Sequence, residues 1–255
     1  MIAAELSGQQ EHQKEYFDAE FREYHEYTPE RWRVSFNQRI FSALDLPGSG
    51  GPFLDVGVGG SGATVIEAAR IGISAAGCDL SVPGIRSARR FADSEGVGES
   101  VTLVACAAES LPFADGAFAS ASIEAVLEHL DNDGEAAREL ARVVRPGGRV
   151  WVTVPHAYRH IPLPLWPWYM AHDRRIGHKR HYDSDRLTSL MTAAGFELVR
   201  VAYSGHPVKV AQLAVDRIAP AERRESLWWK LERRDHRKGE RPRGAIQLSA
   251  VFERR

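Results

Sequence analysis

The sequence predicts an α/β fold built on a doubly wound, mostly parallel sheet. Two observations support this prediction. Apolar, β-branched runs alternate with helical patterns from residue 53 to residue 252, and a glycine-rich turn follows the first run. Ligands of such a sheet gather at the carboxyl ends of its strands. The candidate strands are Phe53–Val56, Ile73–Asp79, Val101–Ala105, Ala117–Ile123, Arg149–Val154, Phe196–Ser204 and Ala245–Phe252.

Helices are predicted between most of these strands. Ala63–Ala69 follows the glycine-rich turn, and Ser184–Ala194 precedes the sixth candidate strand. Gly134–Val144 is the clearest helix, because an Arg-Pro-Gly-Gly sequence follows it and stops it.

Residues 1–48 are expected to form a helical cover, because aromatic residues there recur at close to helical spacing. A run of Pro and Gly at 47–52 marks a boundary, and residues 49–255 are expected to form the ligand-binding domain. Two long segments interrupt the strand–helix alternation, at about 156–182 and 205–244. We expect both insertions to cover the site; surface elaboration or a dimer contact is the alternative.

The composition is that of a globular protein without a nucleic-acid or membrane signature. The 255 residues are 44% apolar and carry a net charge of −1, so no basic excess points to nucleic acid. No apolar run reaches the roughly 18 residues that a spanning helix needs. Cys78 and Cys106 lie in apolar stretches and cannot make a disulfide framework, which favours a reduced, cytoplasmic protein.

The glycine-rich turn has the spacing of a nucleotide-binding turn. Gly57, Gly59 and Gly62 satisfy the pattern G-x-G-x-x-G, in which a missing Cβ lets the backbone approach a ligand. Asp55 precedes the first of these glycines by two residues. A carboxylate there is a poor neighbour for a pyrophosphate and a good one for a ligand that carries positive charge.

A second acidic residue, Asp79, ends the second candidate strand about 20 residues after the turn, the spacing at which an acid contacts a ribose. Its carboxylate can accept hydrogen bonds from both ribose hydroxyls of an adenosine cofactor. The alternative is that Asp79 caps a helix. The turn and Asp79 alone do not distinguish a nicotinamide dinucleotide from S-adenosylmethionine.

Three further motifs follow in order, in residues 108–118 (around Leu111-Pro112-Phe113), 123–130 and 142–148. Together with the turn, they make residues 50–204 resemble the class I S-adenosylmethionine-dependent methyltransferases that act on small molecules. The resemblance implies a Rossmann-like sheet of seven strands whose last strand is antiparallel. It also implies S-adenosylmethionine as the cofactor.

The same resemblance implies which residues hold the cofactor. Asp55 would receive the ammonium of the methionine tail, directly or through water, and Ser61, which stands where the family usually has a third glycine, would bond its carboxylate. The family often has an adenine-binding Asp where this chain has Ala107, so the backbone there or the Glu109 side chain would hold the adenine. The expected cofactor-binding residues are Asp55, Gly57, Gly59, Gly60, Ser61, Asp79, Leu80, Ala107, Ala108, Glu109 and Glu124.

The acceptor side of the site is expected in residues 172–182, which follow the fifth candidate strand. His178 or His181 would serve as the general base, because histidine titrates near neutrality. Arg and Lys residues of this segment would hold an anionic group of the acceptor. The alternative is that His178 orders the loop. The spacing of His and Asp here matches no standard metal motif, so no metal is expected.

We therefore expect methyl transfer to an O or N atom of a small or mid-sized organic acceptor, a specialised metabolite or a sugar- or lipid-linked intermediate. Two alternatives stay open: an NAD(P)-dependent oxidoreductase, and a cofactor-binding homologue without catalysis. The expected partner is this acceptor, with no nucleic acid, and a homodimer is a further expectation.

Overall fold

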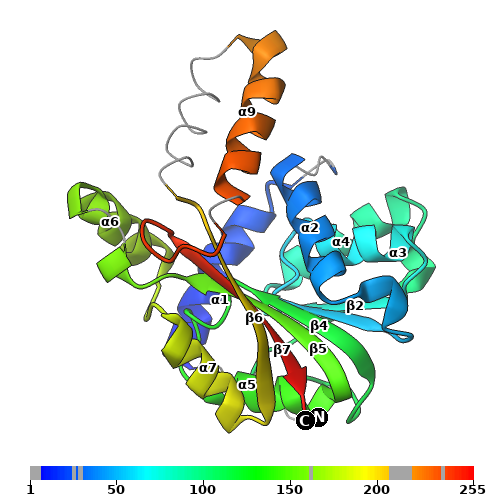
Figure 1. Ribbon diagram of the computed structural model, residues 1–255. Coiled ribbons are helices and arrows are strands. Elements are labelled where there is room, and N and C mark those ends of the chain that lie inside the picture. Colours follow the sequence, from blue (N-terminus) through cyan, green and yellow to red (C-terminus); the bar gives the residue numbers. More distant parts are fainter. Residues whose placement is uncertain (1–6, 25–26, 28–30, 161–162, 207–219, 237–238) are drawn as a thin grey trace.

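A computed structural model of the protein describes residues 7–24, 27, 31–160, 163–206, 220–236 and 239–255. Seven strands of these residues form one sheet in the order β3-β2-β1-β4-β5-β7-β6 (Figure 1). Neighbouring strands are parallel, except that β7 is antiparallel to both β5 and β6. The predicted fold class is thus confirmed. The strands are β1 (Phe53–Val56), β2 (Ala75–Asp79), β3 (Val101–Ala105), β4 (Phe118–Glu124), β5 (Val144–Pro155), β6 (Phe196–Ser204) and β7 (Gln247–Arg254).

Each face of the sheet has its own hydrophobic core, because successive side chains of a strand point to opposite faces. In β1, for example, Phe53 packs into one core and Leu54 into the other. The helices of the Phe53 side are α2 (Arg31–Ala43), α3 (Ala63–Arg70) and α4 (Val82–Ser94), and those of the Leu54 side are α5 (Asp133–Val143) and α7 (Ser184–Ala193).

Further helices lie outside these two layers. Helix α1 begins at a capping box, in which Ser7 and Gln10 each accept the backbone N–H of the other, and it packs against α4. Helix α9 projects from the body (Figure 1) and is tied to α2 by an Arg39–Glu232 ion pair of 3.0 Å. These helices are α1 (Gly8–Phe21), α6 (Trp166–Ile176) and α9 (Ala221–His236), with short 3-10 helices at Leu46–Gly48, Gly98–Ser100, Tyr158–His160 and Leu163–Leu165.

Four strands begin elsewhere than predicted; β4 begins one residue late and β7 two residues late. Strand β2 begins two residues late, because the Ile73 N–H bonds to the Ala68 carbonyl at the end of α3, 3.1 Å away. Strand β5 begins at Val144 rather than at Arg149, because Val144 already pairs with Phe118 of β4. Residues 207–219 and 237–238 of the expected second insertion lie outside the described residues.

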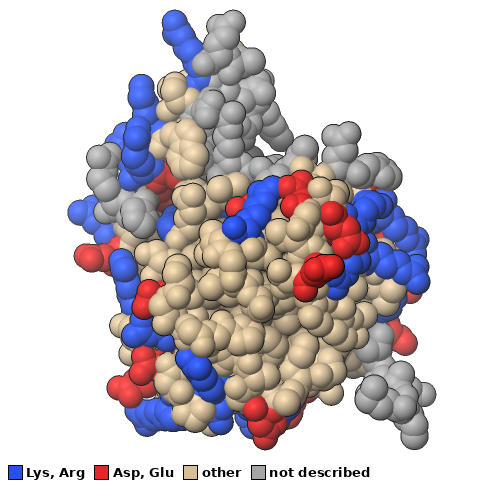
Figure 2. Space-filling model, turned by 90° about the vertical axis from the view of Figure 1, so that its right-hand side faces the viewer, with Lys and Arg blue, Asp and Glu red and all other residues tan. Residues whose placement is uncertain are grey.

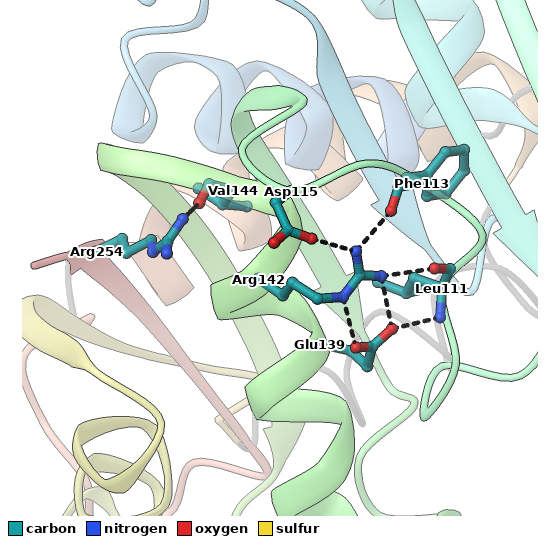
Figure 3. A network of polar contacts seen from close by, with 7 residues as sticks. All are labelled: Leu111, Phe113, Asp115, Glu139, Arg142, Val144 and Arg254. Atoms are coloured by element: carbon teal, nitrogen blue, oxygen red, sulfur yellow. Dashed lines mark hydrogen bonds and ion pairs between the residues drawn. The ribbon is translucent and has the colours of Figure 1, made fainter.

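Arg142 of α5 joins two of the sequence motifs into one structural unit (Figure 3). It donates hydrogen bonds to the carbonyls of Leu111 and Phe113, each 2.7 Å long. It also forms ion pairs of 2.8 Å with Asp115 and with Glu139. Glu139 in turn accepts the Leu111 N–H at 2.7 Å. The loop after β3 is thereby fixed against α5.

Charges of both signs are mixed on the molecular surface. On the face shown in Figure 2, Lys and Arg occur beside Asp and Glu toward the rim, and uncharged residues fill much of the middle. This face shows no single basic patch of the kind that nucleic acid prefers. Within the described ranges, no helix combines the length and the hydropathy required to cross a membrane.

We predict that Arg142→Lys lowers the free energy of unfolding by about 1–2 kcal/mol, because Lys lacks the planar fork and leaves partly buried carbonyls without a donor. Chemical denaturation measures this loss. Arg138→Lys is the control, since Arg138 lies on the same helix in an exposed ion pair, and it should change stability by less than about 0.5 kcal/mol. Equal losses in both variants would contradict the assigned role of Arg142.

Candidate functional site

A cavity of about 490 Å³ lies at the carboxyl ends of β1, β2, β3 and β4, beneath α1. The strand order reverses between β1 and β4, which is where a doubly wound sheet binds its ligands. Of the residues predicted from the sequence, those in the cavity wall are Gly57, Gly59, Asp79, Leu80, Ala107, Ala108, Glu109, Glu124 and His178.

The turn after β1 requires glycine at its first position. Gly57 has a φ of 82°, a left-handed conformation, and a Cβ there would lie 2.3 Å from the Val126 side chain. The N–H groups of Gly57 and Val58 both bond to the Cys78 carbonyl, at 2.8 and 3.0 Å. The turn is therefore held against the end of β2, and its backbone faces the cavity.

Asp79 ties the end of β2 to this turn. Its carboxylate accepts the N–H groups of Gly59 and Ser81, each at 2.9 Å. Burial raises the pKa of Asp79, whereas these backbone hydrogen bonds lower it. Ser81 rather than Asp79 caps α4, because the Ser81 hydroxyl accepts the Gly84 N–H at 3.1 Å. The alternative role of Asp79 as a helix cap is therefore wrong.

Two more carboxylates, Asp55 and Glu124, lie at the ends of adjacent strands. Burial and the negative charge of Glu124 raise the pKa of Asp55 to about 7, against the opposing effects of Ser122 and Arg33. The Ser122 hydroxyl donates to Asp55 at 2.5 Å, and Arg33 of α2 pairs with Glu124 at 2.9 Å. Burial also raises the pKa of Glu124. Arg33 offsets one of the two negative charges, so the site favours a cationic ligand group.

Helix α1 forms the roof of the cavity. The Phe21 ring packs closely on the glycine-rich turn, where a Cβ at Gly60 would lie 2.9 Å from it. The ring also packs on the start of α4, where a Cβ at Gly84 would lie 2.7 Å from it. Asp18 of α1 accepts a hydrogen bond of 2.5 Å from the Ser81 hydroxyl at the start of α4. Helix α1 is thus anchored on both sides of the glycine turn.

Sequence reasoning missed several residues of the wall. The aromatic spacing predicted a helix near the N-terminus but not which of its side chains face the cavity. Ala125 has a φ of 51°, an unusual value for a residue with a Cβ, and nothing in the sequence signals it. Among these missed residues are Gln10, Gln13, Lys14, Phe17 and Ala125.

Four predicted residues lie outside the wall. Asp55 is 3% exposed, beneath the turn, and Gly60 lies under the ring of Phe21. The Ser61 hydroxyl accepts the Ala63 N–H at 3.4 Å, at the start of α3. The remaining residue, His181, lies behind the carboxylate of Asp173, next to His178. The sequence motif thus contributes to the site both by contact and by supporting the residues that make contact.

His178 lies in the wall as part of a cluster of histidines and acids. Its Nδ1 bonds to Asp173 at 2.8 Å, and its Nε2 is 3.7 Å from Glu128. Asp173 also pairs with Nε2 of His181, at 3.1 Å. The ring of His129, another wall residue, has its centroid 4.8 Å from that of His178. The sequence placed the two histidines in one loop but did not predict that Glu128 and His129 join them.

Burial governs the electrostatics of this cluster. It raises the pKa of Glu128 to about 8, helped by the charge of Asp173. It lowers the pKa of His129 to about 4, helped by His178. Burial would also raise the pKa of Asp173, but hydrogen bonds from His178 and His181 outweigh it and hold that pKa at about 2.

The basic residues that follow His178 contact protein acids. Lys179 bonds to Asp131, and Arg180 pairs with Asp133 at 3.0 Å. The expected role of this pair in holding an anionic acceptor is therefore less direct than the sequence suggests, because both already tie the loop to the start of α5.

Of the two expected insertions, the described part of the first reaches the cavity, through Arg175 and Ile176 at the end of α6. The described part of the second does not. Its Trp229 and Glu232 instead line a separate hollow of about 680 Å³, together with Phe36 of α2.

Comparison with known proteins supports the resemblance to methyltransferases that the sequence motifs indicate. Residues 54–152 match a family described as "Methyltransferase domain". The demethylmenaquinone methyltransferase of Corynebacterium kroppenstedtii is 34% identical over 121 residues, covering 48% of this chain and 47% of that protein. The norajmaline N-methyltransferase of Rauvolfia serpentina is 26% identical over 179 residues, covering 69% of this chain and 60% of that protein. The chain thus spans about half the length of the curated relatives it matches.

The fold also has a solved counterpart. The geranyl diphosphate C-methyltransferase from Streptomyces coelicolor A3(2), determined with Mg²⁺, geranyl diphosphate and S-adenosyl-L-homocysteine, superposes with a TM-score of 0.72. It is 15% identical, and the superposition covers 99% of this chain and 100% of that chain. The matched residues 54–152 contain the glycine turn, Asp79 and the later motifs. Residues 54–152 therefore carry a methyltransferase domain, and the fold of the chain is the one found in class I S-adenosylmethionine-dependent methyltransferases.

Proposed function

We propose that the protein is an enzyme of small-molecule biosynthesis that transfers the methyl group of S-adenosylmethionine to an oxygen or nitrogen atom. The acceptor would be a small or mid-sized organic molecule, a specialised metabolite or a sugar- or lipid-linked intermediate. The observation that carries the proposal is the meeting of Asp55, Asp79 and Glu124 around one glycine turn, at a cavity of about 490 Å³.

The polar groups of the cofactor have matching groups at these strand ends. Asp79 offers carboxylate oxygens to the ribose hydroxyls, and Gly57 and Gly59 offer close backbone approach. Glu124 lies in the wall with Asp55 behind it, and together they offer negative charge to the ammonium of the methionine tail. We infer that Asp55 acts through its field or a bridging water, since it is 3% exposed.

The adenine would lie at the end of β3. The backbone of Ala107 and Ala108 forms part of the wall there. Glu109 adds a buried carboxylate oxygen, Oε2, that has no hydrogen-bond partner among the described residues. An adenine amino group can donate to this oxygen, which would replace the Asp that the family often uses.

Methyl transfer from a sulfonium depends mainly on holding the acceptor in line with the sulfur–carbon bond. Such orientation contributes up to about 7–11 kcal/mol in favourable cases. Helix α1 supports this role, because Phe17 and Phe21 add apolar surface to the cavity wall against which an acceptor can pack.

We propose His178 rather than His181 as the catalytic residue on the acceptor side, because His178 lines the cavity. Asp173 orients its ring, and Nε2 can hydrogen-bond an O–H or N–H group of the acceptor. That contact is the one a general base needs. An anionic acceptor group is supported by Arg175, which also lines the cavity, whereas Lys14 of the same wall pairs with Asp18 at 2.6 Å.

The two alternatives are weaker. A nicotinamide dinucleotide would bring its pyrophosphate next to Asp55 and Glu124, where like charges repel. A homologue without catalysis would bind the cofactor in the same way, so turnover with candidate acceptors distinguishes it. We further propose a cytoplasmic protein, supported by the free thiols of Cys78 and Cys106. A homodimer stays a prediction, which light scattering in solution tests.

The proposal is tested by the affinity for S-adenosylhomocysteine, measured by calorimetry. We predict that Asp79→Ala weakens binding about 100-fold, because two hydrogen bonds to a charged group are lost. Asp185→Ala is the control, since Asp185 is exposed on α7, away from the cavity. Unchanged affinity in Asp79→Ala would count against the assigned cofactor site.

The pH dependence of binding tests the role of Asp55. Its pKa of about 7 means that the ligand-free protein holds a proton there below neutrality. An ammonium ligand favours the ionised form, so affinity should rise from pH 5.5 to pH 7 and then level off, by at most about tenfold per unit. Asp55→Asn should remove this slope. Equal affinity of the parent protein at pH 5.5 and pH 8 would contradict the role.

His178→Gln separates acceptor chemistry from cofactor binding. We predict that kcat falls at least about tenfold, the equivalent of one lost hydrogen bond in the transition state. The affinity for S-adenosylhomocysteine should stay within about twofold of the parent value. His181→Gln should have a smaller effect on kcat, and the reverse order of the two variants would overturn the choice of His178.

A further inference from the structure

Glu128, His129 and His178 bring three ligand atoms together at the acceptor side of the cavity. One carboxylate oxygen and two imidazole nitrogens lie within 4.8 Å of one another. Glu128 and His129 follow β4, and His178 follows α6, so the fold assembles the group from distant segments. His129 and His178 both lie in the cavity wall.

Two atoms of this group are buried without a hydrogen-bond partner in the described part of the chain. They are Oε2 of Glu128, a residue that is 1% exposed, and Nδ1 of His129. The other ring nitrogen of His129 donates to the backbone carbonyl of Gly177, so Nδ1 carries the lone pair. Buried polar atoms of native proteins are normally paired, and a cation held by Glu128 and His129 would give these two side chains a partner.

Asp173 supplies the outer support that metal-binding histidines usually have. It bonds to Nδ1 of His178 at 2.8 Å and thereby directs Nε2 toward Glu128, 3.7 Å away. Asp173 is itself held by His181 and by the hydroxyl of Tyr158. A carboxylate that fixes the tautomer and the orientation of a histidine is a recurrent feature of metal sites.

We propose that Glu128, His129 and His178 bind one divalent transition-metal ion, of the kind that prefers mixed imidazole and carboxylate ligands, such as Zn²⁺ or Co²⁺. A tetrahedral ion with bonds of about 2.1 Å holds its ligand atoms about 3.4 Å apart. The widest pair, at up to 4.8 Å, would therefore close by about 1.4 Å, which side-chain rotation can supply.

The ion would keep at least one position open toward the cavity, as ions with three protein ligands do. This part of the inference rests on the proposed function, because the open position would receive the oxygen or nitrogen atom that is methylated. Nε2 of His178 would contact that atom as a base in the metal-free protein only, and in the loaded protein the ion would take its place.

Titration of the metal-stripped full chain with Co²⁺ tests the site without any acceptor. We expect about one Co²⁺ per chain, with visible d–d absorption, and displacement by Zn²⁺. Glu128→Gln and His178→Asn should each weaken Co²⁺ binding at least tenfold, and Asp173→Asn should weaken it about 10–100-fold. His12→Asn, an exposed histidine outside the cavity, is the matched control and should bind as the parent does.

The affinity of each variant for S-adenosylhomocysteine reports separately on folding and on the cofactor site. Binding of S-adenosylhomocysteine without stoichiometric Co²⁺ would overturn the metal site and leave the proposed function intact. Equal Co²⁺ affinity in Glu128→Gln, in a variant that still binds S-adenosylhomocysteine, would also overturn it. Co²⁺ binding without S-adenosylhomocysteine binding would support the metal site and contradict the proposed function.

Discussion

The site depends on the concentration of buried carboxylates at one edge of a parallel sheet. Asp55, Asp79 and Glu124 lie on three neighbouring strands whose carboxyl ends meet, so their negative charges share a region of low dielectric. Arg33 of α2 offsets part of this charge and links the N-terminal helices to the site. We propose that the repulsion that remains favours a cofactor that carries an ammonium group.

The roof and the floor of the cavity depend on each other. Gly60 and Gly84 lack side chains, and this lets the Phe21 ring settle on the turn and on the start of α4. Gly60 belongs to the glycine motif, and in this fold the absence of a side chain there leaves space for helix α1. The hydrogen bond between Ser81 and Asp18 holds the same helix from the other side. The N-terminal segment is thus part of the cavity wall.

Much of this arrangement was predictable from the sequence. Strands β1, β3 and β6 have the predicted bounds, because β1 and β6 lie between glycine or proline residues and β3 follows two polar residues. The glycine turn and Asp79 were predictable because a turn that a ligand approaches closely requires glycines at fixed positions. The acid at the end of the next strand then follows at a characteristic distance along the sequence. The cluster around His178 was not predictable, because Glu128 and His129 come from a distant segment of the chain. Residue spacing within the loop of His178 does not show that these two residues lie beside it. The sequence also did not predict which face of α1 lines the cavity, because this depends on how α1 packs against α4.

The central claim is that the buried acidic strand ends select a cofactor with a positive charge over one with a pyrophosphate. The most direct measurement is the thermal stability of the protein with S-adenosylhomocysteine, NAD and NADP in parallel, since a ligand that binds the folded state raises its melting temperature. The account predicts a clear rise with S-adenosylhomocysteine, about 2.7 kcal/mol of added stability at 100 times its Kd. It predicts no rise with either dinucleotide. Stabilisation by NAD or NADP alone would contradict it.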